Sequence, residues 1–95
     1  MTFAAADPVP SGRPCPVVQV DDRAPSMLDD FAGRRTVVLD CYGGRQVITG
    51  LGAYHGEFIR FHEKDVATDK DVRVWRITPA STSGFAAEAI PAGQE

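Results

Sequence analysis

Two β-rich runs joined by two glycines decide the fold: residues 36–42 read TVVLDCY, and residues 45–51 read RQVITGL. The intervening Gly43-Gly44 allows the positive φ values that a two-residue hairpin turn requires. Alternation places Val37, Leu39 and Cys41 on one face of the first strand. Gly50 and Gly52 then predict a bulge or a sharp bend, which is typical of a small sheet that curls into a barrel.

Further strands are expected on the C-terminal side of this hairpin, at residues 57–62 and 72–77, with a charged loop between them. On the N-terminal side, residues 25–33 are expected to form a short helix with Ser26 as N-cap and Gly33 as its stop. The fold class predicted is therefore mainly β (α+β): a short N-terminal helix followed by a 4–5-stranded antiparallel Sm-like or SH3-like barrel.

The chain of 95 residues has room for one domain. Residues 1–16 contain four of the seven prolines and are expected to form a flexible leader. The barrel is expected over residues 17–78. Residues 79–95 are expected to form a flexible tail that includes a short edge strand around residues 85–90.

Composition favours an ordinary globular protein, with 43% hydrophobic and 24% charged residues. The formal net charge of -3 does not favour nucleic acid overall, although most of the basic residues are arginine, which leaves room for a local patch. No signal peptide or membrane span is recognised, so a cytoplasmic location is expected. Cys15 and Cys41 lack a CxxC spacing, and whether they pair stays open.

Part of the chain, residues 27–79, resembles the bacterial Sm-like proteins, in which a helix precedes a curved five-stranded sheet. Within that group it is most similar to the small acidic Rho-inhibitor family (Rof or YaeO). The similarity rests on Cys15-Pro16, Asp21-Asp22, the glycine hairpin and Arg76-Ile77-Thr78. Hfq is more distant, because residues 74–77 lack the Lys and His of its RNA-binding signature.

The resemblance implies a non-enzymatic, protein-binding regulator of transcription that inhibits Rho and so favours antitermination. An acidic face would occupy the basic RNA-binding surface of Rho, and the residues implied are Asp21, Asp22, Asp29 and Asp30. The simpler interpretation, which we prefer, is that these four carboxylates cap and solvate the helix. A related hypothesis is a phage- or plasmid-encoded, anti-CRISPR-like inhibitor that uses acidic mimicry against another nucleic-acid machine.

Binding of RNA or single-stranded DNA is the main alternative from another class. Arg60, Arg73, Trp75 and Arg76 lie on neighbouring predicted strands, and Phe58 and Tyr54 offer aromatic surface. Alternation places Arg73 and Trp75 on one face and Arg76 on the other. The preferred interpretation places Trp75, Phe58 and Ile59 in the core and the arginines in surface ion pairs.

Catalysis and metal binding are not expected. Cys41 lies in an apolar run, where a buried structural thiol is more common than a nucleophile activated by His55 or His62. The spacing of His55, His62, Glu63 and Asp65 matches no compact metal motif. No cofactor is therefore predicted.

Overall fold

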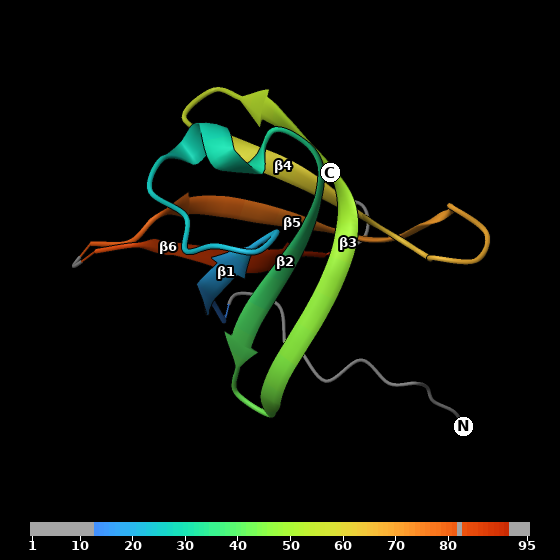
Figure 1. Cartoon of the computed structure of the whole chain (residues 1–95), viewed down its shortest axis with the longest axis horizontal. Coiled ribbons are helices and arrows are strands. Elements are labelled where there is room, and N and C mark those ends of the chain that lie inside the picture. The colour runs from blue at the N-terminus through green and yellow to red at the C-terminus, as the bar shows by residue number, and fades with distance from the viewer. Residues whose placement is uncertain (1–12, 82, 92–95) are drawn as a thin grey trace.

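The computed structural model describes residues 13–81 and 83–91, which form six antiparallel strands and one 3-10 turn. The elements are β1 (Cys15–Val20), η1 (Leu28–Phe31), β2 (Gly33–Cys41), β3 (Gly44–His55), β4 (Phe58–Lys64), β5 (Asp71–Pro79) and β6 (Phe85–Ile90). Each strand pairs with its neighbour in the sequence, and β1 also pairs with β6, so the sheet closes into a barrel (Figure 1).

The expected small barrel is confirmed at this coarse level, but the expected count of four to five strands is wrong. β6 is not an edge strand, because it lies between β5 and β1. Its inward positions Phe85, Ala87 and Ala89 are all buried. Alanine carries little apolar surface, so this alternation is weak in the sequence. β1 starts at Cys15, and residues 1–12 of the expected leader lie outside the described part of the chain.

The expected N-terminal helix is also wrong, because only the four-residue 3-10 turn η1 forms. Ser26 does not cap it; instead, the Asp30 carboxylate accepts hydrogen bonds from the Ser26 and Met27 amides, at 2.8 and 3.0 Å. The chain is extended again at Ala32, with φ -79° and ψ 139°. A single turn is enough to bury Phe31, whose ring meets that of Phe85 edge-on at 5.2 Å.

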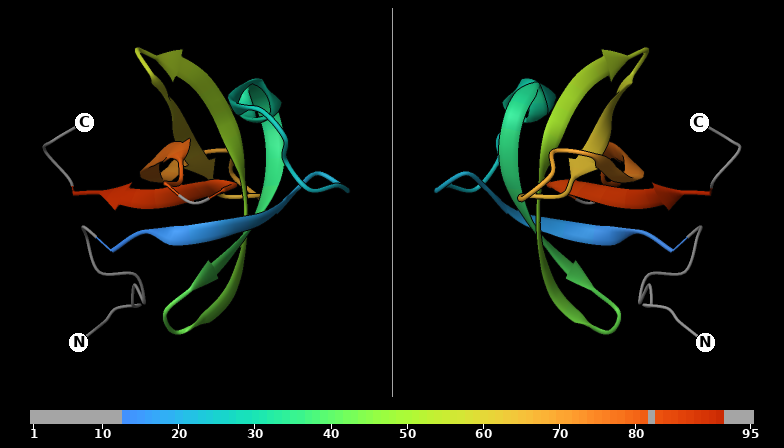
Figure 2. Two further views of the ribbon diagram at one scale, coloured as in Figure 1. Left: turned by 90° about the vertical axis from the view of Figure 1, so that its left-hand side faces the viewer. Right: turned by 90° about the vertical axis from the view of Figure 1, so that its right-hand side faces the viewer.

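The central hairpin forms as the alternation predicts, and Val37, Leu39 and Cys41 are all buried. Its loop is Tyr42-Gly43, one residue earlier than expected, because Cys41 pairs with Gly44. β3 then bends so that its first part pairs with β2 and its last part with β4 (Figure 2). A Cβ at Gly52 would overlap the Phe31 carbonyl oxygen, so glycine lets η1 approach this strand.

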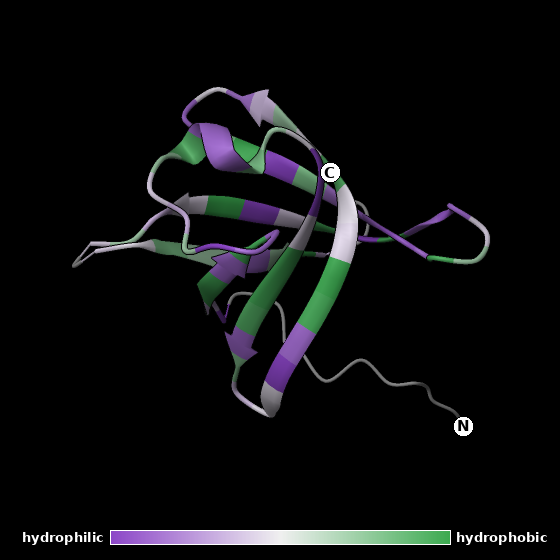
Figure 3. Ribbon diagram, in the orientation of Figure 1, coloured by the Kyte–Doolittle hydropathy of each residue, from purple (hydrophilic) through white to green (hydrophobic). Residues whose placement is uncertain are grey.

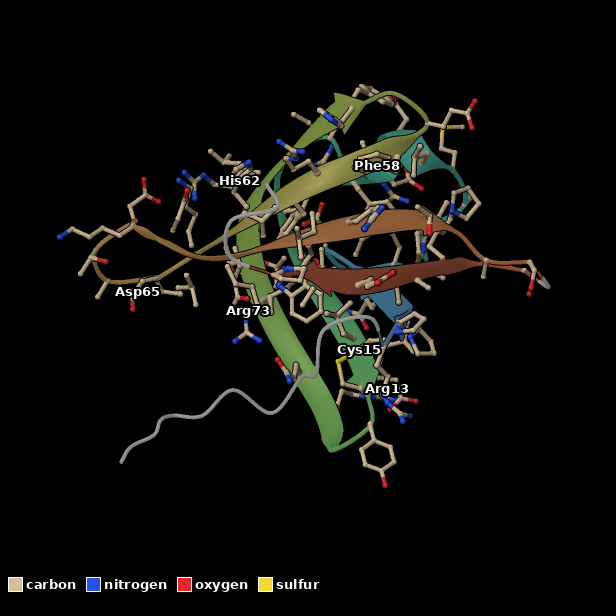
Figure 4. All side chains as sticks on the ribbon, turned by 180° about the vertical axis from the view of Figure 1, so that it is seen from behind. Arg13, Cys15, Phe58, His62, Asp65 and Arg73 are labelled. Carbon is tan, nitrogen blue, oxygen red and sulfur yellow. A yellow bond between two sulfur atoms is a disulfide. The ribbon has the colours of Figure 1, made fainter. Side chains whose placement is uncertain are left out.

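The core fills the barrel with alternate residues of all six strands, and Trp75, Phe31, Phe61 and Leu39 are among its largest fully buried side chains. The same alternation appears as bands of hydropathy along the strands in Figure 3. A disulfide between Cys15 and Cys41 joins β1 to β2 inside this core (Figure 4).

Candidate functional site

Asp30, one of the four acidic residues of the predicted partner face, is held inside the η1 turn. Its carboxylate accepts hydrogen bonds from the Ser26 and Met27 amides. In addition, its Oδ1 atom lies 3.0 Å from Nη2 of Arg23. This arginine contact, reinforced by the Ser26 and Met27 amides, holds the pKa of Asp30 far below its ordinary value. Only 12% of the Asp30 side chain is exposed. The residue therefore stabilises the local fold and offers little charge to a partner.

Asp21 and Asp29 also have partners within the chain. Asp21 accepts a hydrogen bond from the Thr36 amide at 3.2 Å and pairs with Arg35 at 3.3 Å. Asp29 accepts a hydrogen bond from the Tyr54 hydroxyl, which raises the pKa of that tyrosine.

Asp22 is the one member of the four with no hydrogen bond or ion pair to any residue between 13 and 91 that the structure describes. Arg23, the next residue, interacts with Asp30 and also with the charge of Asp21. Arginine charges are thus interspersed among the carboxylates, and the group does not form a uniformly acidic face.

Arg73 and Trp75, two of the predicted nucleic-acid contacts, lie on the inward side of β5. Trp75 is fully buried and donates a hydrogen bond from Nε1 to Glu63 at 2.9 Å. Arg73 stacks over the Trp75 ring at 5.4 Å and pairs with the same carboxylate at 3.2 Å. Trp75 therefore has no surface on which a base could stack.

Arg60 and Arg76 lie together on the outer surface, where β4 and β5 run side by side. The two residues are direct Cα partners in the β4–β5 ladder, and both are half-buried. Adjacent strands lie about 4.8 Å apart, so the two cationic side chains leave the sheet next to each other. Alternation in the sequence predicted that Arg76 points away from the core. The position of Arg60 opposite Arg76 depends on the register of β4 with β5, which the sequence alone did not give.

An aromatic rim holds the two guanidinium groups in place. The Arg76 guanidinium lies over the Phe58 ring at 5.5 Å, and Nη2 of Arg60 lies 3.4 Å from Nε2 of His55. The His55 and Phe58 rings are themselves in contact, with centroids 5.1 Å apart. We call this set, His55, Phe58, Arg60 and Arg76, the arginine face. Sequence reasoning considered His55 only for catalysis and metal binding, and so missed its place beside these arginines.

The arginine face carries positive charge without a carboxylate partner in the described part of the chain. Neither Arg60 nor Arg76 forms an ion pair there, although Arg23, Arg34 and Arg35 each do. Glu88 of β6 is the Cα partner of Arg76 but no ion pair joins them. The Nε atoms of Arg60 and Arg76 are both buried without a hydrogen-bond partner. A buried N–H donor without an acceptor is costly, so an acceptor that reaches these donors would be favourable.

Other kinds of site find no support in residues 13–81 and 83–91. That part of the chain has no pocket and no cluster of three potential metal ligands. His62 lies 3.4 Å from Asp71, but the pair is on an exposed strand surface and also contacts Lys64. Figure 4 shows His62 and Phe58 at opposite ends of β4. Because the His55 ring contacts Phe58, the environments of His55 and His62 are separate.

Among the described residues, no helix has the length and apolar character needed to cross a membrane. The arginine face is therefore the strongest candidate site, and it is assembled from three strands, β3, β4 and β5. In comparisons with known proteins, no family model, no curated protein and no solved structure matches the chain.

Proposed function

We propose that the chain is a non-enzymatic binding module that holds the phosphate backbone of a single-stranded nucleic acid on the arginine face. The observation that carries the proposal is the pairing of Arg60 with Arg76 on adjacent strands, with no carboxylate partner for either in the described residues. Like charges placed directly opposite each other destabilise a sheet. A bound anion removes this cost, because it neutralises both groups at once.

Guanidinium chemistry supports phosphate as the ligand. A planar guanidinium offers a fork of N–H donors that matches the oxygens of a phosphate. Stacking on Phe58 fixes the orientation of the Arg76 fork before the ligand arrives. Fewer rotamers are then lost on binding, which favours affinity.

A single strand is favoured over a duplex by the shape and size of the site. The arginine face lies on the outside of a small barrel, and such surfaces suit single strands that combine backbone contacts with stacked bases. Tyr54 is 56% exposed at the end of β3, but its Cα partner is the buried Ile59 and its hydroxyl bonds to Asp29, so its ring lies on the other face of the sheet from this surface. The net charge of -3 opposes binding of a polyanion. We therefore expect modest affinity that depends strongly on salt.

The salt dependence gives a quantitative test. Two phosphate contacts to a single strand predict a slope of about -1.4 in a plot of log K against log salt, since each contributes about -0.7. Fluorescence anisotropy with a labelled oligonucleotide of about 16 nucleotides measures this slope. The double variant Arg60→Gln/Arg76→Gln should lose both the binding and the slope.

Arg45→Gln is the matched control, because Arg45 is an exposed arginine on β3 whose Cα partner is Asp40. It should bind as the native chain does. Equal binding by the double variant, or no binding by the native chain at the lowest salt, would refute the proposal.

The Rho-inhibitor hypothesis and its anti-CRISPR-like variant stay predictions. Both require Asp21, Asp22, Asp29 and Asp30 to meet a basic partner surface, and Asp22 is the member best placed to do so. Salt-sensitive binding to Rho that competes with RNA and is lost in Asp22→Asn would support the first hypothesis. Binding that is insensitive to this change, or no binding at all, would remove it.

A further inference from the structure

Within residues 13–81 and 83–91, one edge of β3 is open over residues 44–49. β3 pairs with β2 from Gly44 to Gly52, but its ladder with β4 starts only at Gly50. No other strand of the described residues pairs with this half of β3. Every second residue of an antiparallel strand turns its N–H and C=O away from its partner. This edge therefore presents unpaired backbone groups, on a hairpin that projects from the barrel in Figure 2.

The open edge has few of the features that normally protect such edges from pairing. Exposed edges are commonly blocked by proline, lysine, a bulge or an inward-pointing charge. Residues 44–49 read GRQVIT, with no proline or lysine, and their ladder with β2 has no register shift. Val47, Ile48 and Thr49 favour strands, and Val47 is 66% exposed. The segment is well suited to accept another strand.

We propose that residues 45–49 of this edge pair with residues 45–49 of a second copy of the chain, antiparallel, about a two-fold axis at Val47. Such an interface is self-complementary and closes at two copies. Val47 then lies opposite Val47 of the second copy. Because Val38 is the β2 partner of Val47, a row of four valines runs across the joined sheets. Apolar cross-strand pairs of this kind stabilise a sheet.

Charge also favours a second copy in this register. Arg45 is the only charged residue of the segment, and the two-fold axis places it opposite Thr49 of the second copy. The two Arg45 residues are then four positions apart along the strands, or about 13 Å at 3.3 Å per residue. That distance exceeds the Debye length of about 8 Å at physiological salt. A parallel, in-register pairing would instead set Arg45 directly against Arg45.

Sedimentation of the full chain tests the proposal from about 10 μM to about 1 mM, the range in which a weak interface associates. The mean mass should rise from 10.2 kDa towards twice that value. Val47→Lys should stay monomeric at every concentration, because it places two lysines opposite each other. Val72→Lys, at a 49% exposed position of β5, a strand that does not pair with β3, is the matched control and should associate as the native chain does.

Backbone hydrogen exchange gives a second readout that does not depend on a variant. Outward amides of residues 44–49 should exchange more slowly at high concentration, while those of β5 should not change. A constant mass of 10.2 kDa over the whole range would overturn the proposal. Association that persists in Val47→Lys would also overturn it, since the contact would then lie elsewhere.

Discussion

Reduction of the Cys15–Cys41 disulfide should cost the barrel a large part of its stability. The bond closes a loop of 26 residues, and loop-closure entropy for that length corresponds to about 3.5 kcal/mol at 25 °C. With a urea m value of about 1.5 kcal/mol per M, the unfolding midpoint should fall by about 2 M. The effect arises mainly in the unfolded chain, whose ends at β1 and β2 become free to separate.

Urea unfolding of the oxidised and reduced chain measures this difference. The fluorescence of Trp75, the only tryptophan and fully buried, reports the transition. The variant Cys15→Ala/Cys41→Ala is the control, because added reductant should not change its midpoint. Coincident midpoints for the oxidised and reduced native chain would refute the reasoning. Two free thiols in the native chain under non-reducing conditions would contradict the pairing itself.

Three further changes test the packing and the turn. In urea unfolding, Gly52→Ala should lower the free energy of unfolding by about 3 kcal/mol, because its Cβ overlaps the Phe31 carbonyl oxygen. Gly43→Ala is the control, since the space around its Cβ is open, and it should change the free energy of unfolding by about 1 kcal/mol or less. Phe31→Ala should cost about 4 kcal/mol by the same assay, while Tyr42→Ala, at an 80% exposed position, should fall within about 0.5 kcal/mol of the native chain. The pKa of Asp30 in the folded chain lies below its ordinary value of 3.8. The Asp30 carboxylate therefore stabilises the fold at pH values above 3.8, and this stabilisation is lost as the pH falls below that value. Asp30→Asn should therefore flatten the acid limb of the stability profile, and an unchanged limb would contradict the assigned contacts.

The core of the central hairpin could be predicted from the sequence, because Val37 and Leu39 alternate with less apolar residues over a long strand. The sequence predicted β6 only as a short edge strand, because two of its inward positions are alanines and its apolar alternation is therefore weak. The helix prediction failed because tertiary packing decided the segment: one turn buries Phe31, and the chain must then enter β2 at Gly33.

The candidate site was only partly predictable. Alternation separated Arg76 from Arg73 and Trp75 correctly, as the contacts of Arg73 with Trp75 and of Arg76 with Phe58 show. The neighbourhood of Arg60 and Arg76 depends on the β4–β5 register, which includes a shift at Glu63/Lys64 that no local sequence signal marks. The carboxylates looked alike in the sequence, and only side-chain contacts distinguish the capping residue Asp30 from Asp22.

The disulfide is relevant to the cellular compartment in which the chain is found. Disulfides persist in oxidising compartments and are rare in the reducing cytoplasm. The cytoplasmic location expected from the sequence stays a prediction. Thiol trapping after acid quenching of cells tests it, because free Cys15 and Cys41 would support that location and an intact disulfide would oppose it.

The seam between β1 and β6 has a consequence for the order of folding. All other neighbouring strands follow one another in the sequence, whereas Cys15 and Ala87 meet across most of the chain. Contacts of such long range require a costly loop closure before they contribute stability. The successive hairpins from β2 to β5 should therefore form first, and closure of the seam should be the late step. Substitutions in the seam, such as Ala87→Gly, should then mainly accelerate unfolding and leave the rate of folding nearly unchanged.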